Sequence, residues 1–294
     1  MLCFVVMAHK LPAQAERLVE RLSPYRVFLH VDSRTARPTW AEFEGLASRQ
    51  ANVRLLPRLA TPWASWGAVR AELSGLRAAV EEGASHVVLA SGQDYPLAPV
   101  GAIDTFMGEH AGTSWTTCAA VPVAWLGDRD GGSSRFSFWN MPLRGRRLRV
   151  PMRRRLPDGL SPYYGHANCV LSADLASWVL DELSRRPSIE RFFRYTWTPD
   201  ELFFPTMAMA SPFASHVVST DLWFTNWSAG GAHPRVFTST DAPDLVAAAR
   251  GTGDGAGAKL FARKFDTSVD EGVLDVLDEQ LLGMGGVRHG AAGG

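Results

Sequence analysis

LCFVVMAHKLPAQAERLVERLSPYRVFLHVD, residues 2–32, contains two short apolar runs separated by a segment with helical spacing. The run Leu2–Ala8 predicts a buried strand, and Val27–Val31 predicts a second one. Between them, Pro12–Leu22 carries apolar residues on one helical face: Ala15, Leu18, Val19 and Leu22. A strand, a helix and a strand in this order favour a parallel sheet covered by helices.

The same alternation continues through the first half of the chain. The next predicted elements are a helix at Trp40–Ser48, a strand at Val53–Leu56, a helix at Ala68–Glu82 and a strand at His86–Ala90. We therefore predict an α/β fold with a mostly parallel central sheet flanked by helices. In such sheets, ligands bind beyond the carboxyl ends of the strands, where His9 and Asp32 should lie close together.

The second half is less regular. A strand is expected at Cys169–Ser172, and helices at Asp174–Leu183 and Ala242–Arg250. Another helix should begin near Pro199, because Thr198 can cap it and proline fits the first helical turn. The acidic pair that follows Pro199 would then lie at the positive end of the helix dipole.

Composition excludes several classes of protein. The 294 residues are 46% hydrophobic, which is enough for a large core, and 30 Lys and Arg balance 30 Asp and Glu. This balance argues against nucleic acid as the main partner. Cys3, Cys118 and Cys169 are odd in number and lie in apolar stretches, which favours reduced thiols in a reducing compartment. The first apolar run is too short for a signal peptide or membrane span, so we expect a soluble, cytoplasmic protein without an integral membrane segment.

Six motifs then occur in order along residues 3–266. They are Phe28-Leu29-His30-Val31-Asp32, Trp63-Ala64-Ser65-Trp66-Gly67, Ser91-Gly92-Gln93-Asp94-Tyr95-Pro96-Leu97, Thr198-Pro199-Asp200-Glu201, His233-Pro234-Arg235 and Leu260-Phe261-Ala262-Arg263-Lys264-Phe265-Asp266. Together they make the chain similar to the core-2/I-branching β-1,6-N-acetylglucosaminyltransferase and protein O-xylosyltransferase family.

This resemblance implies a GT-A-like, Rossmann-type fold and an inverting transfer from a UDP-sugar without a divalent metal. Glu201 matches the family's catalytic base, and Arg235 and Lys264 match the basic pair that holds the donor diphosphate. Asp32 falls where such enzymes contact the nucleoside. We expect a donor-binding half at residues 1–117, an acceptor-binding and catalytic half at residues 118–284, and a flexible tail at residues 285–294.

The chemistry of inverting transfer suits these residue types. One carboxylate must take the proton of the acceptor hydroxyl, and Glu201 lies between two aromatic segments whose low polarity suits a base. The alternative is a carboxylate that only stabilises a helix terminus. If the two residues lie on a helix, the side chain of Asp200 points in a different direction from that of Glu201. We therefore expect Asp200 to orient the acceptor or to support the structure.

The departing diphosphate needs a fixed positive charge. Arg235 can bind two phosphate oxygens at once, and Lys264 adds a compact charge, so the pair can replace a metal ion. The alternative is that Arg263 and Lys264 are solvated charges on a loop. The flanking Phe261 and Phe265 favour a segment fixed by packing.

Several other residues are candidates for contact with the sugars. His9 joins Asp32 at the expected donor edge, and Asp94 either contacts sugar hydroxyls, which we favour, or caps the following turn. Trp66 and Trp227 offer rings on which a sugar can stack. The acceptor is expected to be a small molecule or glycan.

We expect neither a metal nor another cofactor. The chain contains one Asp-x-Asp pattern, Asp128-Arg129-Asp130, but the glycines after it favour an exposed turn. Seven arginines lie between Arg144 and Arg155, and this run is expected to flank the acceptor groove or to form an exposed loop. An anionic acceptor would suit it, while RNA or acidic lipid is the less favoured alternative.

UDP-N-acetylglucosamine is the favoured donor, followed by UDP-xylose and UDP-glucose. A non-catalytic protein that binds sugar nucleotides is the main alternative function.

Overall fold

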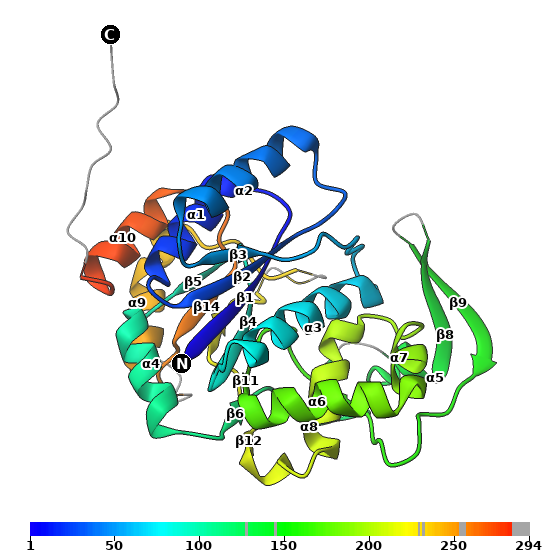
Figure 1. Cartoon of the computed structure of the whole chain (residues 1–294). Helices are drawn as coiled ribbons and strands as arrows, with labels where there is room; N and C mark the ends of the chain where they lie inside the picture. Colours follow the sequence, from blue (N-terminus) through cyan, green and yellow to red (C-terminus); the bar gives the residue numbers. More distant parts are fainter. Residues whose placement is uncertain (127–128, 144–145, 229, 231–232, 253–256, 284–294) are drawn as a thin grey trace. The chain divides into compact units, whose positions relative to one another are not determined.

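The computed structural model describes residues 1–126, 129–143, 146–228, 230, 233–252 and 257–283 (Figure 1). The chain forms two compact units that alternate along the sequence. The first unit contains residues 1–10, 24–91 and 107–221, and the second contains residues 11–23, 92–106 and 222–294. This division does not coincide with the expected boundary after Thr117. The predicted tail at residues 285–294 lies outside the described residues.

Seven strands form the main sheet of the first unit. In spatial order they are β12 (Val217–Val218), β6 (Ser114–Trp115), β11 (Cys169–Ser172), β4 (His86–Ser91), β1 (Leu2–Ala8), β2 (Arg26–Val31) and β3 (Val53–Leu55). β1 pairs in parallel with β2 and β4, β3 is parallel to β2, and β12 is parallel to β6. β11 alone in this sheet is antiparallel to its neighbours. The prediction of a mostly parallel central sheet is confirmed.

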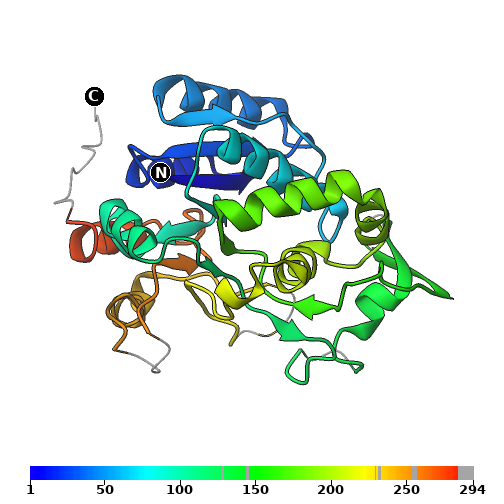
Figure 2. The same cartoon turned by 60° about the horizontal axis from the view of Figure 1, so that its bottom comes forward.

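Three helices pack on this sheet and bury their apolar faces against it: α2 (Arg37–Arg49), α3 (Trp66–Glu81) and α6 (Ala173–Arg185). The other helical segments of the first unit are α5 (Ser133–Ser137), α7 (Pro187–Phe193), α8 (Phe203–Ala210) and the 3-10 turns η1 (Pro199–Glu201) and η2 (Ala214–His216). α3 and α6 run alongside each other over the sheet (Figures 1 and 2). Ser65 and Ser172 cap them, since each side chain accepts a backbone hydrogen bond at the helix start.

α3 packs closely on β1 because residue 75 lacks a side chain. A Cβ atom at Gly75 would lie 2.4 Å from the Cγ1 atom of Val5. Cys3 and Cys169 are fully buried in the same core, and all three cysteines are free thiols. The burial of Cys3 and Cys169 agrees with their place in apolar stretches of the sequence.

Most of the arginine run is a strand. Arg146–Arg153 is strand β9, which pairs antiparallel with β8 (Phe138–Leu143) in a two-stranded sheet, and Arg154 and Arg155 follow it outside regular secondary structure. Arg144 lies outside the described residues. A second small sheet pairs β7 (Ala119–Ala120) with β10 (Tyr163–Tyr164). The expectation of an exposed loop is therefore wrong for β9, because the backbone is paired along its length.

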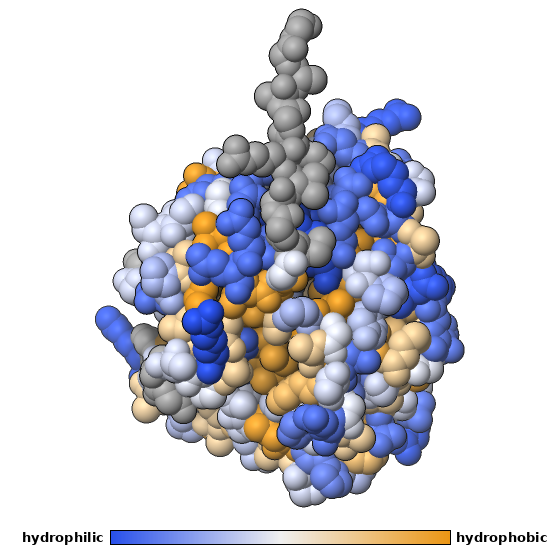
Figure 3. Space-filling view, turned by 90° about the vertical axis from the view of Figure 1, so that its left-hand side faces the viewer, coloured by the Kyte–Doolittle hydropathy of each residue, from blue (hydrophilic) through white to orange (hydrophobic). Residues whose placement is uncertain are grey.

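The second unit has its own sheet and helices. Its strands, in spatial order, are β13 (Trp223–Thr225), β14 (Phe261–Arg263) and β5 (Asp94–Pro96); its helical segments are α1 (Pro12–Arg21), η3 (Ser239–Asp241), α9 (Ala242–Arg250) and α10 (Gly272–Gln280). α4 (Val100–Glu109) begins in this unit and ends in the first. On the side that carries α9 and α10, apolar side chains lie among hydrophilic ones (Figure 3).

Among the residues that the structure describes, no helix has both the length and the apolar character needed to cross a membrane.

Candidate active site

Glu201 lies at the end of the 3-10 turn η1 in the first unit. Its side chain is 27% exposed, so solvent or a ligand can reach it. The Nη1 atom of Arg135 lies 2.6 Å from its Oε2 atom, and the Tyr164 hydroxyl donates a hydrogen bond to the same carboxylate. The carboxylate is thus accessible but fixed in direction by two donors.

Arg135 is held in place by several contacts of its own. Its Nη1 atom also donates to Thr198 Oγ1 at 2.8 Å, and its guanidinium lies 5.4 Å from the centre of the Tyr164 ring. The Arg135 carbonyl accepts hydrogen bonds from the Trp197 N–H and the side chain of Asn140, both at 2.8 Å. Asn140 is fully buried. The position of Arg135 is therefore set by α5, by the β8–β9 hairpin and by the segment before η1.

The predicted helix start at Pro199 needs correction. Pro199–Glu201 is a 3-10 turn, and the α-helix begins only at Phe203. Thr198 does not cap the turn through its side chain, because that hydroxyl accepts a bond from Arg135 instead. Glu201 consequently belongs to a short turn whose backbone is tied down, with the Glu201 carbonyl accepting a 2.8 Å hydrogen bond from Gly165.

Asp200 occupies a very different environment from Glu201. Its Oδ1 atom is buried and has no hydrogen-bond partner among the described residues. Burial, followed by repulsion from Glu201, raises the pKa of Asp200. Glu72 on α3 is 6% exposed, and burial and the charge of Asp200 raise its pKa as well. The two adjacent carboxyl groups therefore differ in environment: that of Asp200 is buried, and that of Glu201 is accessible to solvent.

His9 and Asp32 meet at the carboxyl ends of β1 and β2, where we expected them. The Thr35 hydroxyl donates to the His9 carbonyl, and Asp32 accepts hydrogen bonds from the Arg34 guanidinium at 2.7 Å and the Thr61 hydroxyl at 2.8 Å. Burial alone would raise the pKa of Asp32, but these bonds outweigh it and lower the pKa. His9 is exposed, whereas Asp32 is buried and already has partners.

In the second unit, Arg235 follows the loop after β13. Its guanidinium is ion-paired with Asp241, and its N–H donates to the Asn226 carbonyl at 2.8 Å. Burial alone would raise the pKa of Asp241, but the bonds from Arg235 and Thr238 outweigh it and lower the pKa. Arg235 is therefore held by a carboxylate at the start of α9 and is only partly exposed.

Lys264 lies directly after β14, and its backbone is fixed. Its carbonyl accepts from the Phe237 N–H at 2.8 Å, and the neighbouring Phe265 N–H donates to the Gln93 carbonyl at the same distance. Burial, then the charges of Lys264 and Arg263, lower the pKa of His233. The cations of this segment therefore lie within electrostatic reach of His233, and the expected fixing of the segment by packing is supported by the full burial of Phe265.

Arg263, the residue before Lys264, forms an ion pair with Asp94. Its Nη1 atom lies 2.7 Å from the Oδ1 atom of Asp94, which is 1% exposed. This contact pairs the Arg263 guanidinium with a buried carboxylate. Asp94 itself is enclosed and paired, so its carboxylate is not an open sugar-binding group in this structure.

The two candidate tryptophans differ sharply. Trp66 is 4% exposed at the start of α3, where its ring stacks on Phe193 and meets the edge of Phe203. Its indole belongs to the core of the first unit and offers no open face to a sugar. Trp227 in the second unit is 47% exposed and keeps a surface on which a ring can stack.

The Asp-x-Asp pattern is only partly visible. Asp128 lies outside the described residues, and Asp130 Oδ2 accepts a 2.8 Å hydrogen bond from the Ser134 N–H in the first turn of α5. Elsewhere in the described ranges, His, Cys, Asp and Glu side chains form no group of three suited to a metal ion.

Comparison with known proteins gives the family. The model of the Core-2/I-Branching enzyme family matches residues 2–247 of this chain. The chain belongs to this family. The match includes Glu201, Arg235 and both strand ends that carry His9 and Asp32, whereas Lys264 lies beyond it.

Several xylosyltransferases are similar to this Core-2/I-Branching chain at low sequence identity. Xylosyltransferase 2 of Rattus norvegicus is 24% identical over 280 residues, a match that covers 87% of this chain and 30% of the relative. Xylosyltransferase 1 of Canis lupus familiaris is 23% identical over 311 residues, covering 96% and 31%. The chain spans less than a third of the length of these relatives.

Among solved structures, a 4-diphosphocytidyl-2C-methyl-D-erythritol synthase from Anaerococcus prevotii superposes with a TM-score of 0.34 at 10% identity. This superposition covers 63% of this chain and 75% of that one. A similarity this low adds nothing to the family assignment.

Three residues beside the proposed base of this family member could not be recognised in the sequence. Arg135, Tyr164 and Glu72 lie far from Glu201 along the chain, in segments without a chemical motif. Only the fold brings them to η1, through α5, β10 and α3. An arginine followed by an aromatic residue in a loose segment carries no signal that distinguishes it from the other arginines of this region.

Proposed function

We propose that this chain is an inverting glycosyltransferase that moves a sugar from a UDP-sugar to an acceptor hydroxyl. The observation that carries the proposal is Glu201, a partly exposed carboxylate held by Arg135 and Tyr164 in a chain of the Core-2/I-Branching enzyme family. A carboxylate fixed in direction and open to solvent suits proton transfer in a transition state.

In the proposed step, the acceptor hydroxyl gives its proton to the Glu201 carboxylate. The acceptor oxygen forms a bond to the anomeric carbon while the bond from that carbon to the diphosphate oxygen breaks, so the sugar configuration inverts and UDP leaves. Arg135 and Tyr164 keep the carboxylate directed during the transfer. Glu201, now protonated, returns its proton to solvent.

Negative charge grows on the departing diphosphate, and we assign Arg235 and Lys264 to stabilise it. A guanidinium that binds two oxygens, together with a lysine ammonium, can supply the electrostatic role of a metal ion. The family resemblance is what assigns this role to Lys264 rather than to its neighbour Arg263. His9 and Asp32 are the candidates for the nucleoside, and Trp227 for a sugar ring.

Three donors are candidates. The family resemblance favours UDP-N-acetylglucosamine, and the relatives named xylosyltransferases support UDP-xylose as the second donor. UDP-glucose is the third. The free thiols support action in a reducing compartment such as the cytoplasm.

The test is a donor screen with purified protein in excess EDTA, in which release of UDP is measured with and without candidate acceptors. We expect turnover with one UDP-sugar in EDTA, and a loss of about 100-fold or more in kcat for Glu201→Gln with unchanged UDP binding. Activity that requires added manganese would overturn the metal-free mechanism. Unchanged activity in Glu201→Gln would remove this residue as the base.

A non-catalytic protein that binds sugar nucleotides is the alternative. It would bind UDP-sugars in the same assay but release no UDP with any acceptor, in the wild type and in Glu201→Gln alike.

A further inference from the structure

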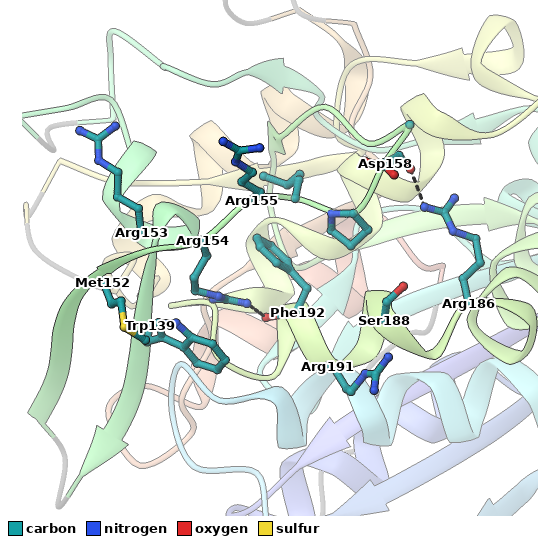
Figure 4. A pocket seen from close by; sticks show the side chains of 13 residues that line it. Trp139, Met152, Arg153, Arg154, Arg155, Asp158, Arg186, Ser188, Arg191 and Phe192 are labelled. Atoms are coloured by element: carbon teal, nitrogen blue, oxygen red, sulfur yellow. Dashed lines mark hydrogen bonds between the residues drawn. The ribbon is translucent and has the colours of Figure 1, made fainter.

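An open groove of about 1120 Å³ lies in the first unit between the end of β9 and α7. Five arginines line it, and the carboxylate of Asp158 is the only acidic group among its lining residues. Arg153, Arg154 and Arg155 come from the end of β9 and the segment after it, while Arg186 and Arg191 come from the other side (Figure 4). Its charge is therefore strongly positive in a chain whose total charge is zero.

These arginines have two separate roles. The side chain of Arg154 packs into one side of the groove. It donates hydrogen bonds to the Phe192 and Tyr195 carbonyls, and its guanidinium lies 4.0 Å from the centre of the Phe192 ring. Arg186 donates a 2.5 Å hydrogen bond to the Asp158 carbonyl and pairs with Glu182. Arg154 and Arg186 therefore both stabilise the structure of the groove through their own hydrogen bonds.

Arg153, Arg155 and Arg191 are different. All three are exposed, and within the described ranges none of their side chains makes a hydrogen bond, an ion pair or a ring contact. These three exposed guanidinium groups line one groove, so an anion bound there would meet positive charge from both of its sides. Guanidinium groups bind carboxylates and phosphates through two parallel hydrogen bonds.

The groove also offers apolar surface between its charges. Trp139, Met152 and Phe192 line it beside the arginines, and Ser188 adds a hydroxyl. An alternation of aromatic surface and cations suits sugar rings that carry acidic groups, because the ring faces pack on apolar side chains while the oxyanions meet the guanidinium groups. A concave site of this size holds several sugar units, whereas a membrane surface would require an exposed apolar face.

Contacts within the first unit connect this groove to the proposed base. Arg154 donates to the Tyr195 carbonyl, and Trp197 and Thr198 of the same segment contact Arg135, the partner of Glu201. The groove wall and the proposed catalytic carboxylate are therefore both hydrogen-bonded to the segment that precedes η1.

We propose that this groove binds an acidic oligosaccharide, with Arg153, Arg155 and Arg191 as its oxyanion ligands, and that this oligosaccharide is the acceptor. The assignment as acceptor rests on the proposed glycosyltransferase function; the binding itself does not.

The test measures binding of an oligogalacturonide by isothermal titration calorimetry, without any UDP-sugar present. We expect saturable binding that weakens as sodium chloride is added, and no binding of a neutral dextran oligomer. The double variant Arg153→Ala/Arg155→Ala should bind at least tenfold more weakly. Arg191→Ala, from the opposite wall, should also bind more weakly.

A matched control removes the same charge elsewhere. Arg70 and Arg77 are exposed on α3 and, like Arg153, Arg155 and Arg191, have no side-chain partner in the part of the chain that the structure describes. Arg70→Ala/Arg77→Ala should retain wild-type affinity, and circular dichroism should confirm that both double variants fold. If both double variants bound the oligogalacturonide equally weakly, the loss would come from the lower total charge of the protein, and the groove would not be the binding site.

The same calorimetric experiment is repeated with other classes of anionic ligand. If single-stranded DNA, polyaspartate or phosphatidylserine vesicles bind more tightly than the oligogalacturonide and lose that binding in Arg153→Ala/Arg155→Ala, the sugar assignment is wrong. If the oligogalacturonide binds but no sugar is transferred by any variant, the binding site stands and the proposed function fails. If transfer proceeds on neutral acceptors while the oligogalacturonide does not bind, the groove proposal alone fails.

Discussion

Two neighbouring carboxyl groups in η1 show how environment separates residues of the same chemistry. Asp200 is buried beside Glu72, while Glu201 reaches solvent and is held by Arg135. The motif Thr198-Pro199-Asp200-Glu201 allowed the sequence to identify Glu201 as the candidate base. It could not reveal Arg135 or Tyr164, because their place beside Glu201 depends on contacts between segments that are distant in the chain.

Burial of Asp200 predicts a pH-dependent cost in stability. Its folded pKa lies above the ordinary value of 3.8, because burial and Glu201 disfavour the charged form. The unfolded chain therefore loses this proton at lower pH than the folded chain, and the free energy of unfolding falls as pH rises above about 4 toward the folded pKa. Asp200→Asn removes this term and should raise the free energy of unfolding at pH 7.5 by about 1 kcal/mol or more.

Urea unfolding at pH 4.5 and pH 7.5 checks this prediction. Asp181→Asn, at an exposed position of α6, is the matched control and should leave the pH dependence of the wild type unchanged. An Asp200→Asn protein whose stability changed with pH as steeply as the wild type would show that Asp200 is not the source.

Arg135 is predicted to act as a positioning residue for Glu201. Arg135→Ala removes the 2.6 Å contact and frees the carboxylate to rotate, and a misplacement of about 1 Å can cost about 100-fold in rate. We expect kcat to fall by about this factor while KM for the donor changes little. Arg135→Lys should recover part of the loss, since it restores the charge without the second hydrogen bond to Thr198.

The measurement is a comparison of kcat, KM and the pH dependence of kcat in the three proteins. A structural role alone would lower the amount of folded enzyme without shifting the pH dependence. An Arg135→Ala enzyme with wild-type kcat would contradict the role.

At the level of elements, the regular βα alternation was predictable and the β8–β9 hairpin was not. β1, β2 and β4 are short apolar runs buried on both faces, and the helices between the first strands carry apolar residues at the helical period, so pattern and structure agree. β9 is rich in arginine, and its order comes from tertiary contacts: Arg147 donates to Asn140 Oδ1 at 2.7 Å and lies over the Trp197 ring. Leu148, Val150 and Met152 do alternate along β9 with the period of a strand, but Leu148 and Met152 are exposed, so this alternation does not mark a face buried in the core.

The packing of α3 on β1 gives a prediction for Gly75. Alanine raises helix propensity by about 1 kcal/mol relative to glycine, but its Cβ atom would collide with Val5, where the contact would be 2.4 Å. We expect the collision to dominate and Gly75→Ala to lower the free energy of unfolding by about 1–3 kcal/mol.

Gly101 in α4 is the matched control, because a Cβ atom there meets no other atom within 4 Å. Gly101→Ala should therefore be neutral or stabilise by up to about 1 kcal/mol. Urea unfolding midpoints of both variants decide the question, and a stabilising Gly75→Ala would mean that β1 yields to the new side chain.

At the scale of the whole molecule, the division into units could not be predicted from the order of the motifs. The second unit is assembled from three separate parts of the chain, residues 11–23, 92–106 and 222–294, so no single boundary separates it from the first. What joins these parts is visible only in the fold. Asp278 on α10 accepts hydrogen bonds from Arg17 and Arg21 of α1 and from the Tyr95 hydroxyl of β5.

Asp278 should therefore be the residue on which closure of the second unit depends most. It is 5% exposed, and although burial alone would raise its pKa, the bonds from Arg21, Arg17 and Tyr95 outweigh it and lower the pKa. Its stabilisation is present above the ordinary pKa of 3.8 and is lost as pH falls through the lower folded value. Asp278→Ala leaves two neighbouring guanidinium groups without their shared partner.

Breaking a buried ion pair in this way costs about 3–5 kcal/mol, and we expect a loss of about 3 kcal/mol here because both arginines keep some contact with water. Hydrogen exchange followed by mass spectrometry should show faster exchange in α1 and α10 together, while the strands of the first unit keep their protection. Asp275→Ala is the control: this residue pairs with the same Arg17, but its side chain is 65% exposed, so the expected cost is at most about 1 kcal/mol. Equal effects of the two substitutions would mean that the buried carboxylate does not hold the three segments together, and that apolar packing alone closes the second unit.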